Sequence, residues 1–393
     1  MLLFAFYLAL SLLAAADAAA IARNPYSCTS FVVRVPVHNV TLVVPPFPDF
    51  ADQYAATAFS NEVTKGLSFP APSSASDMNL TTLSTTFDIS ADYCTPNRPG
   101  PRSSTLQILT HGIGFNRSYW DFYLPGAPDD ASYSYINSVT AAGYSTLSWN
   151  RLGIEPSTIP DPYRELQSLV ELAVLTELTR LARGGNIPQV PHPSKVIHVG
   201  HSWGSILSNA LAATEPDLSD GLVLTAYSHL TTYQGLFIAD SSFHIASQNQ
   251  PDRFPSNTYS TGFLTWPDAA ANQYSFFAYP YFDPAVLVQA EATKYPFSAG
   301  EFLTAATLPL EAPNFRGPVL YLAAEADLIF CASDCSAFYG PDSVAVQAFN
   351  GSSSVETYIH PDVGHGINLH KNATGAYNVI LDWSSRHGFS PRH

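Results

Sequence analysis

The sequence predicts an α/β fold, with a mostly parallel central sheet flanked by helices and an aromatic-rich cap inserted late in the chain. Three observations support this prediction. Apolar strand-like runs alternate with helical patterns, as expected for a parallel sheet with crossover helices. A tight turn between two glycines joins a strand to a helix within residues 195–209. Residues 228–316 then break the alternation with many aromatic and few charged side chains.

Residues 1–20 have the pattern of a secretory signal peptide. An apolar run from Leu2 to Ala16 is followed by small residues that offer cleavage sites. No lysine or arginine precedes the run, and an uncleaved membrane anchor is the alternative. The run is short for a membrane span, and no later stretch is long enough. We therefore expect a secreted protein without an integral membrane segment after cleavage.

The first part of the core, residues 21–227, contains regularly spaced strand and helix patterns. The ranges 30–44 and 85–93 alternate apolar and polar residues and predict antiparallel strands. Between them, residues 45–84 predict a surface excursion with one short helix at 52–64. The expected elements that follow are a strand at 105–110, a helix at 133–142, a strand at 144–149 and a helix at 163–183, which Asp161 and Pro162 should begin.

The buried strand at 196–199 leads into Gly200-His201-Ser202-Trp203-Gly204 and then a helix at 205–213. A serine on so sharp a strand-to-helix turn is strained, and residues two before and two after it need to lack side chains. The turn raises the Ser202 hydroxyl above the sheet at the positive end of a helix. This is the position of a nucleophile, although the motif alone also occurs in ordinary turns.

A second glycine turn, His111-Gly112-Ile113-Gly114, follows the strand at 105–110. Glycines let backbone N–H groups face the crevice at the end of the strand. We expect the amides of Ile113 and Trp203 to form an oxyanion hole. We further expect His111, Gly112 and His201 to lie against the substrate.

The predicted sheet continues with strands at 221–227, before the cap, and at 319–323 and 355–359, after it, and the chain closes with a helix at 376–385. The second part of the core, residues 317–393, carries an acid and a histidine just past these last two strands. Asp327 is preferred to Glu325 because it lies further beyond its strand, and to Asp362, which shares the loop of the histidine. Glycines flank His365, which favours it over His360 and His370. Ser202, Asp327 and His365 then stand in the order nucleophile, acid and base.

The insertion at 228–316 is expected to cover the crevice as a cap and to line an apolar pocket. About two thirds of its rings should simply pack the core of the cap. Which rings contact a substrate does not follow from the sequence.

Four cysteines suit an oxidising compartment and allow three pairings. Pairing by neighbourhood gives Cys28 with Cys94 and Cys331 with Cys335. A metal site is a poor alternative, because C-x-x-C is missing and the cysteines are split across the chain. Glycosylation sequons stand at Asn39, Asn79, Asn350 and Asn372. A further one at Asn116 lies close to the expected site, and we expect it to be unused.

The net charge of −15, with only 12% charged residues, argues against nucleic acid as a partner. Such a surface repels phosphate backbones and anionic lipid. A neutral and fairly apolar small molecule is the better partner.

These motifs together resemble the secreted members of the α/β-hydrolase fold superfamily. His111-Gly112, the elbow at Ser202, Asp327 and Gly364-His365-Gly366 match its oxyanion, nucleophile, acid and base positions, over about residues 100–390. Residues 150–154 are also similar to its D-x-x-G segment, with Asn150 where aspartate is usual. The resemblance implies hydrolysis of a carboxylic ester or lactone through an acyl-enzyme, with no cofactor and no metal.

Several other activities share this constellation. Dehalogenases and epoxide hydrolases of similar fold use an aspartate nucleophile, which Ser202 excludes. Proline-type aminopeptidases need acidic groups to bind a free amine, and the cap has few. Hydroxynitrile lyases and lactonases use the same three residues, so the sequence does not separate them from esterases. A non-catalytic binding protein would be expected to lack one of the three, and none is missing.

Overall fold

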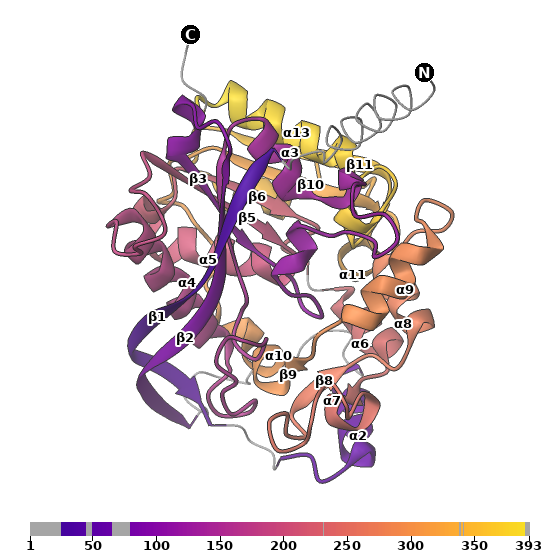
Figure 1. Ribbon diagram of the computed structural model, residues 1–393. Helices are drawn as coiled ribbons and strands as arrows, with labels where there is room; N and C mark the ends of the chain where they lie inside the picture. Colours follow the sequence, from indigo (N-terminus) through magenta and orange to yellow (C-terminus); the bar gives the residue numbers. More distant parts are fainter. Residues whose placement is uncertain are drawn as a thin grey trace, which may run out of the picture.

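The computed structural model describes residues 25–44, 49–64, 79–230, 232–337, 339–340 and 342–389. The predicted signal peptide at 1–20 lies outside these residues. An eight-stranded sheet forms the centre of the molecule, in the order β1-β2-β4-β3-β5-β6-β10-β11, and helices cover both of its faces (Figure 1). The α/β fold predicted from the sequence is therefore confirmed.

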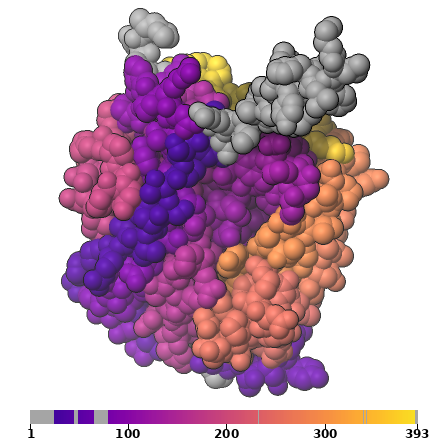
Figure 2. Space-filling model, in the orientation of Figure 1, coloured from indigo at the N-terminus to yellow at the C-terminus, as the bar shows by residue number. Residues whose placement is uncertain are grey.

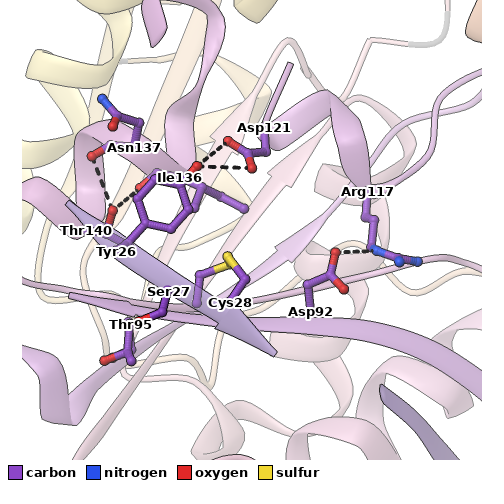
Figure 3. The surroundings of a disulfide bond; sticks show 12 residues. Tyr26, Ser27, Cys28, Asp92, Thr95, Arg117, Asp121, Ile136, Asn137 and Thr140 are labelled. Atoms are coloured by element: carbon purple, nitrogen blue, oxygen red, sulfur yellow. Dashed lines mark hydrogen bonds and ion pairs between the residues drawn. A yellow bond between two sulfur atoms is a disulfide. The ribbon is translucent and has the colours of Figure 1, made fainter. Parts of the chain in front are cut away.

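One edge of the sheet is a long antiparallel pair, β1 (Tyr26–Val43) and β2 (Leu80–Pro96). Both strands are longer than predicted, because backbone pairing continues past the apolar alternation, from Tyr26 opposite Pro96 to Val43 opposite Leu80. The disulfide Cys28–Cys94 joins the two strands directly across the ladder (Figure 3).

The other strands run parallel to one another, so their carboxyl ends meet at one edge of the sheet. They carry the residues that the sequence analysis singled out. Their bounds are β3 (Thr105–Thr110), β4 (Ser145–Trp149), β5 (Lys195–His201), β6 (Gly221–Thr225), β10 (Val319–Ala326) and β11 (Val355–Gly364). The last strand runs five residues past its predicted end, with an irregular register after Ala324.

The helices of the core are α3 (Tyr135–Ala141), α4 (Ser168–Arg183), α5 (Trp203–Thr214) and α13 (Ala373–Arg386), together with the short α11 (Leu328–Cys331) and α12 (Val344–Gln347). The prediction that α4 begins at Asp161–Pro162 is wrong. Carbonyl groups of the expected first turns accept hydrogen bonds from the cap instead, from Gly300 N–H to Pro162 and from Ser298 Oγ to Leu166. These carbonyls are then not free for a helix, and α4 starts at Ser168.

The interval predicted as the cap contains a small three-stranded sheet and several short helices. Its elements are α6 (Gln234–Ser241), β7 (His244–Ile245), α7 (Ala246–Asn249), β8 (Phe263–Thr265), α8 (Ala269–Phe276), α9 (Pro284–Thr293), β9 (Phe297–Ser298) and α10 (Ala299–Thr304). Most of its rings are buried, whereas Tyr274, Tyr279 and Tyr281 are exposed. In the space-filling view this orange segment packs directly against the core (Figure 2).

The helix predicted at 52–64 is present as α2 (Gln53–Thr64), but it does not lie apart on the surface. It packs on the cap beside α6 and β7 (Figure 1). The amide of Gln53 donates to the carbonyl of Phe243 at 2.8 Å, and its oxygen accepts from the N–H of Ile245 at 2.8 Å. The cap layer is therefore built from two segments that are far apart in the sequence.

Within the described residues, no helix is long and apolar enough to cross a membrane. The second disulfide, Cys331–Cys335, closes a loop of four residues at the end of α11. Both cysteine pairs are thus the ones predicted by neighbourhood, and no cysteine is free.

Candidate active site

Ser202 stands between β5 and α5 with φ 54° and ψ −116°, a strained conformation for a residue with a side chain. The flanking glycines make this turn possible. A Cβ on Gly200 would come within 2.5 Å of the Gly204 carbonyl carbon, and one on Gly204 within 2.0 Å of the Thr110 carbonyl oxygen. The backbone around Ser202 therefore tolerates no side chain at either position.

Asp327 and His365 meet across the ends of β10 and β11. The Nδ1 atom of His365 lies 2.7 Å from Oδ2 of Asp327, and both side chains are buried. The other carboxylate oxygen accepts from the Phe330 N–H at 3.0 Å, which fixes the carboxylate. Because the carboxylate can only accept, Nδ1 carries the proton and Nε2 is left with a lone pair.

The Nε2 atom of His365 is buried and has no hydrogen-bond partner in the described part of the chain. An unpartnered buried nitrogen is costly to the fold and therefore calls for an explanation. The ring lies 5.2 Å from the ring of His201, the residue just before Ser202, and stacks on Phe330 at 5.8 Å. The His365 ring therefore lies close to the residue that precedes Ser202.

The competing acids and histidines have other partners. Glu325 is exposed and accepts from the Asp362 N–H at 3.0 Å. His360 Nε2 bonds to the carbonyl of Asn372 at 2.8 Å, and His370 bonds to three backbone groups. Among these candidates, only Asp327 and His365 form a hydrogen bond between an acid and a histidine side chain.

The turn after β3 passes directly over the serine. A Cβ on Gly112 would lie 3.0 Å from the Cβ of Ser202, so a side chain at this position would crowd the serine. Within the described residues, the amide N–H groups of Ile113 and Trp203 donate no hydrogen bond. Two free backbone donors beside a serine could stabilise a negatively charged oxygen.

The two histidines expected against the substrate are fully buried. His111 Nδ1 bonds to the carbonyl of Gly112 at 2.8 Å, and its Nε2 accepts from the Arg151 N–H at 3.2 Å. The ring has no nitrogen left for a substrate, so its role is to shape the turn. Burial, with the nearby Arg151 charge, holds the pKa of His111 well below its usual value, and the ring is neutral.

His201 stacks on Tyr119 at 4.3 Å, and its Nδ1 bonds to the Tyr119 hydroxyl at 3.1 Å. Its Nε2 is buried without a partner in the described residues. Burial and the neighbouring histidines lower the pKa of His201, so this ring too is neutral. It forms part of the wall behind Ser202.

The cap closes over these residues with aromatic rings. Phe276 lies 5.6 Å from the His365 ring and 4.8 Å from Trp266. Trp266 in turn fills the space above Gly114, where a Cβ would come within 2.0 Å of the indole. The surroundings of His365 and Gly114 on this side are therefore mostly apolar.

Sequence reasoning missed a buried charged cluster behind the elbow, formed by Arg151, Glu171 and Glu301. The signal was a glutamate among the apolar residues of the run 168–178, on a helix face that packs inward. No group of three or more His, Cys, Asp or Glu suited to a metal occurs within the described ranges.

Comparison with known proteins places these features in a wider context. A sequence model described as "Alpha/beta hydrolase family" matches residues 107–374. No curated protein matches the chain. The similar solved structures include an esterase from Thermogutta terrifontis, with 15% identity, a TM-score of 0.49, and coverage of 77% of this chain and 95% of that one. Epoxide Hydrolase A from Mycobacterium thermoresistibile has 15% identity and a TM-score of 0.47, and the match covers 76% of this chain and 94% of that one. A monoacylglycerol lipase from Paleococcus ferrophilus has 14% identity and a TM-score of 0.46, and the match covers 74% of this chain and 97% of that one.

Proposed function

The chain belongs to the alpha/beta hydrolase family, and from this premise we propose that it is a serine hydrolase that cleaves carboxylic esters or lactones of a fairly apolar small molecule. The single observation that carries the proposal is the hydrogen bond between Asp327 and His365 at 2.7 Å, beside a serine held on a strained turn. A serine hydroxyl is a weak nucleophile, and it needs such a base fixed by such an acid.

In the proposed reaction, the Ser202 hydroxyl attacks the ester carbonyl while His365 Nε2 takes its proton. Asp327 stabilises the imidazolium that forms. The negative oxygen of the tetrahedral intermediate binds to the amides of Ile113 and Trp203. His365 then protonates the leaving alcohol, and water repeats the sequence on the acyl-enzyme. No step requires a group that the chain lacks.

The substrate preference is inferred from the cap. The aromatic walls formed by Phe276, Trp266 and Phe115 favour an apolar group on the ester. The two glutamates of this part of the cap already have partners, since Glu291 pairs with Lys294 and Glu301 with Arg151. They are therefore not free to bind the amine of a peptide, which disfavours aminopeptidase activity.

We propose that the protein acts outside the cell, because two disulfides and a signal-like leader suit secretion. The sequon residues Asn39, Asn79 and Asn350 are exposed, whereas Asn372 bonds to the carbonyl of Pro361 at 3.1 Å. Sequencing the amino terminus of the secreted protein tests the extracellular location. Digestion with a glycosidase tests for glycans.

The activity test is hydrolysis of p-nitrophenyl esters, from acetate to long chains, by the wild type and by Ser202→Ala. Labelling of Ser202 by a fluorophosphonate is measured in parallel, since it needs the activated serine but no particular ester. Activity that disappears with Ser202 supports the proposal, and the chain-length preference then gives the size of the acyl pocket. A wild type that neither turns over an ester nor becomes labelled would contradict it.

A further inference from the structure

Three ionisable side chains are buried together behind the elbow. Arg151 from the loop after β4, Glu171 from α4 and Glu301 from the cap helix α10 are each at most 1% exposed. Arg151 Nη1 lies 2.6 and 2.8 Å from the two Glu171 oxygens and 2.5 Å from Glu301 Oε1. Buried ion pairs are a poor source of stability, so this cluster calls for another explanation.

The cluster contacts both sides of the proposed oxyanion site. Glu171 Oε2 accepts a hydrogen bond from the indole Nε1 of Trp203 at 2.6 Å. Trp203 directly follows Ser202, and its backbone amide is one of the two proposed donors. On the other side, the Arg151 N–H donates to His111 Nε2 at 3.2 Å, and His111 opens the turn that carries the second donor.

The cap completes the cluster through α10. Glu301 forms a capping box with Ser298, in which the Ser298 N–H donates to Glu301 Oε2 at 2.7 Å. Its other oxygen remains for Arg151. The next residue, Phe302, stacks parallel to Trp203 at 6.4 Å. One turn of the cap therefore touches both the charged cluster and the residue that follows the serine.

Glu171 acts here as a hydrogen-bond acceptor rather than as a charge. One guanidinium faces two carboxyl groups, and burial raises the pKa of Glu171 well above its usual value. A protonated Glu171 beside the Arg151–Glu301 pair leaves the cluster neutral overall. Its carbonyl oxygen can still accept from the indole.

We propose that Glu171 is a positioning residue, which holds the Trp203 indole so that the Trp203 amide points at the oxyanion, within a cluster that docking of α10 completes through Glu301. This inference rests on the proposed function. It predicts that the cap does more than enclose substrate, because its seating also sets the alignment of one oxyanion donor.

A double-mutant cycle tests it. Trp203→Phe removes the indole N–H and keeps the backbone amide and a ring to stack on Phe302. Glu171→Met removes the acceptor at similar size, and Arg151 retains Glu301, so no buried charge is left alone. The two variants and their combination are compared with wild type by kcat, KM and thermal midpoint on the best p-nitrophenyl ester. Glu171→Gln keeps an acceptor, and Glu177→Gln is the matched control, because it alters only the surface ion pair with Arg180 on the same helix.

Each single variant should lower kcat by about tenfold with little change in KM, because loss of alignment acts in the transition state. The double variant should be about as slow as either single variant, since both remove one interaction. Glu171→Gln should regain most of the rate of wild type, and Glu177→Gln should keep the rate of wild type.

Two results would overturn the positioning role. In one, the fold-losses in kcat of the two single variants multiply in the double variant. In the other, both single variants have the kcat of wild type. The same conclusion follows if Glu171→Gln is as slow as Glu171→Met. Failure of the proposed function gives a different result, because the wild type itself would then show neither turnover nor labelling of Ser202, and this inference would fall with it.

Discussion

His370 accepts a hydrogen bond at Nε2 from the backbone N–H of Ala278, at 2.9 Å, and so joins the loop of the proposed base to the cap. The same nitrogen accepts from the Gly364 N–H at 3.0 Å, and Nδ1 donates to the carbonyl of Gly366 at 2.9 Å. The two glycines flank His365. One neutral imidazole therefore holds both the base loop and the cap segment, and a proton on Nε2 would break two of its bonds.

The first prediction concerns acid stability. Burial, which outweighs the Gly366 hydrogen bond, lowers the pKa of His370 from 6.5 to about 4. A base with a lowered pKa stabilises the fold fully above pH 6.5, and this contribution is lost as the pH falls from 6.5 to about 4. The shift corresponds to roughly 3 kcal/mol. We expect the free energy of unfolding of wild type and of His370→Gln to converge by about this amount between pH 7 and pH 4.

Urea titrations at pH 7, 5.5 and 4.5 measure this convergence. Glutamine can place an acceptor where Nε2 lies but cannot take up the proton. His192→Gln, at an exposed position, is the matched control and should run parallel to wild type. A constant gap between wild type and His370→Gln over the whole pH range would contradict the prediction.

The second prediction separates the two acids at the end of β10. Asp327→Asn should lower kcat on esters by on the order of 10⁴, because an amide no longer stabilises the imidazolium and favours the wrong tautomer. Glu325→Gln changes a carboxylate two residues away, which is exposed and accepts only from a backbone amide. Its kcat should stay within about twofold of wild type. Equal losses in the two variants would count against Asp327 as the acid.

The elbow and the sheet could be predicted because their signals are local. Gly200 and Gly204 stand at the only spacing that this turn allows, and the buried strands are short apolar runs. The turn after β3 could be located for the same reason, since His111 and Gly112 directly follow that strand. Such requirements on the backbone conformation depend on residues that lie close together in the sequence.

The start of α4 and the positions of α2 and the charged cluster could not be predicted, because each depends on contacts between distant segments. The Gly300 N–H donates a hydrogen bond to the carbonyl of Pro162, and the side-chain oxygen of Gln53 accepts one from β7. Arg151 and Glu301 are 150 residues apart. The sequence near each of these residues does not indicate which distant segment it contacts.

The third prediction compares the two disulfides. Cys28–Cys94 spans 66 residues and Cys331–Cys335 only four. By loop entropy, replacing the first pair with serines should cost about 4 kcal/mol of unfolding free energy and the second about 2 kcal/mol. The loss of kcat should be larger when the second pair is replaced, because the second bond closes the loop just after Asp327. Chemical denaturation and kcat of the two double variants test both rankings, and a larger kcat loss in the Cys28–Cys94 variant would contradict the second.

The last prediction concerns access to the site. The Phe276 ring contacts both the His365 ring, at 5.6 Å, and Trp266, at 4.8 Å, so it is a ring of the cap that lies against the proposed base. Phe276→Ala removes this wall, and Phe254→Ala removes an equally buried cap ring that packs on Tyr259 and Tyr295 instead. Each truncation should cost about 3–5 kcal/mol of stability, because each leaves a cavity.

Only Phe276→Ala should speed the labelling of Ser202 by a bulky tagged fluorophosphonate relative to a small one, since only this ring stands over the base. The ratio of the two labelling rates cancels any general loss of active protein, and therefore separates access from stability. If Phe254→Ala changes the ratio as much as Phe276→Ala, loosening of the whole cap controls entry. If neither variant changes it, Phe276 does not control the route by which the substrate reaches Ser202.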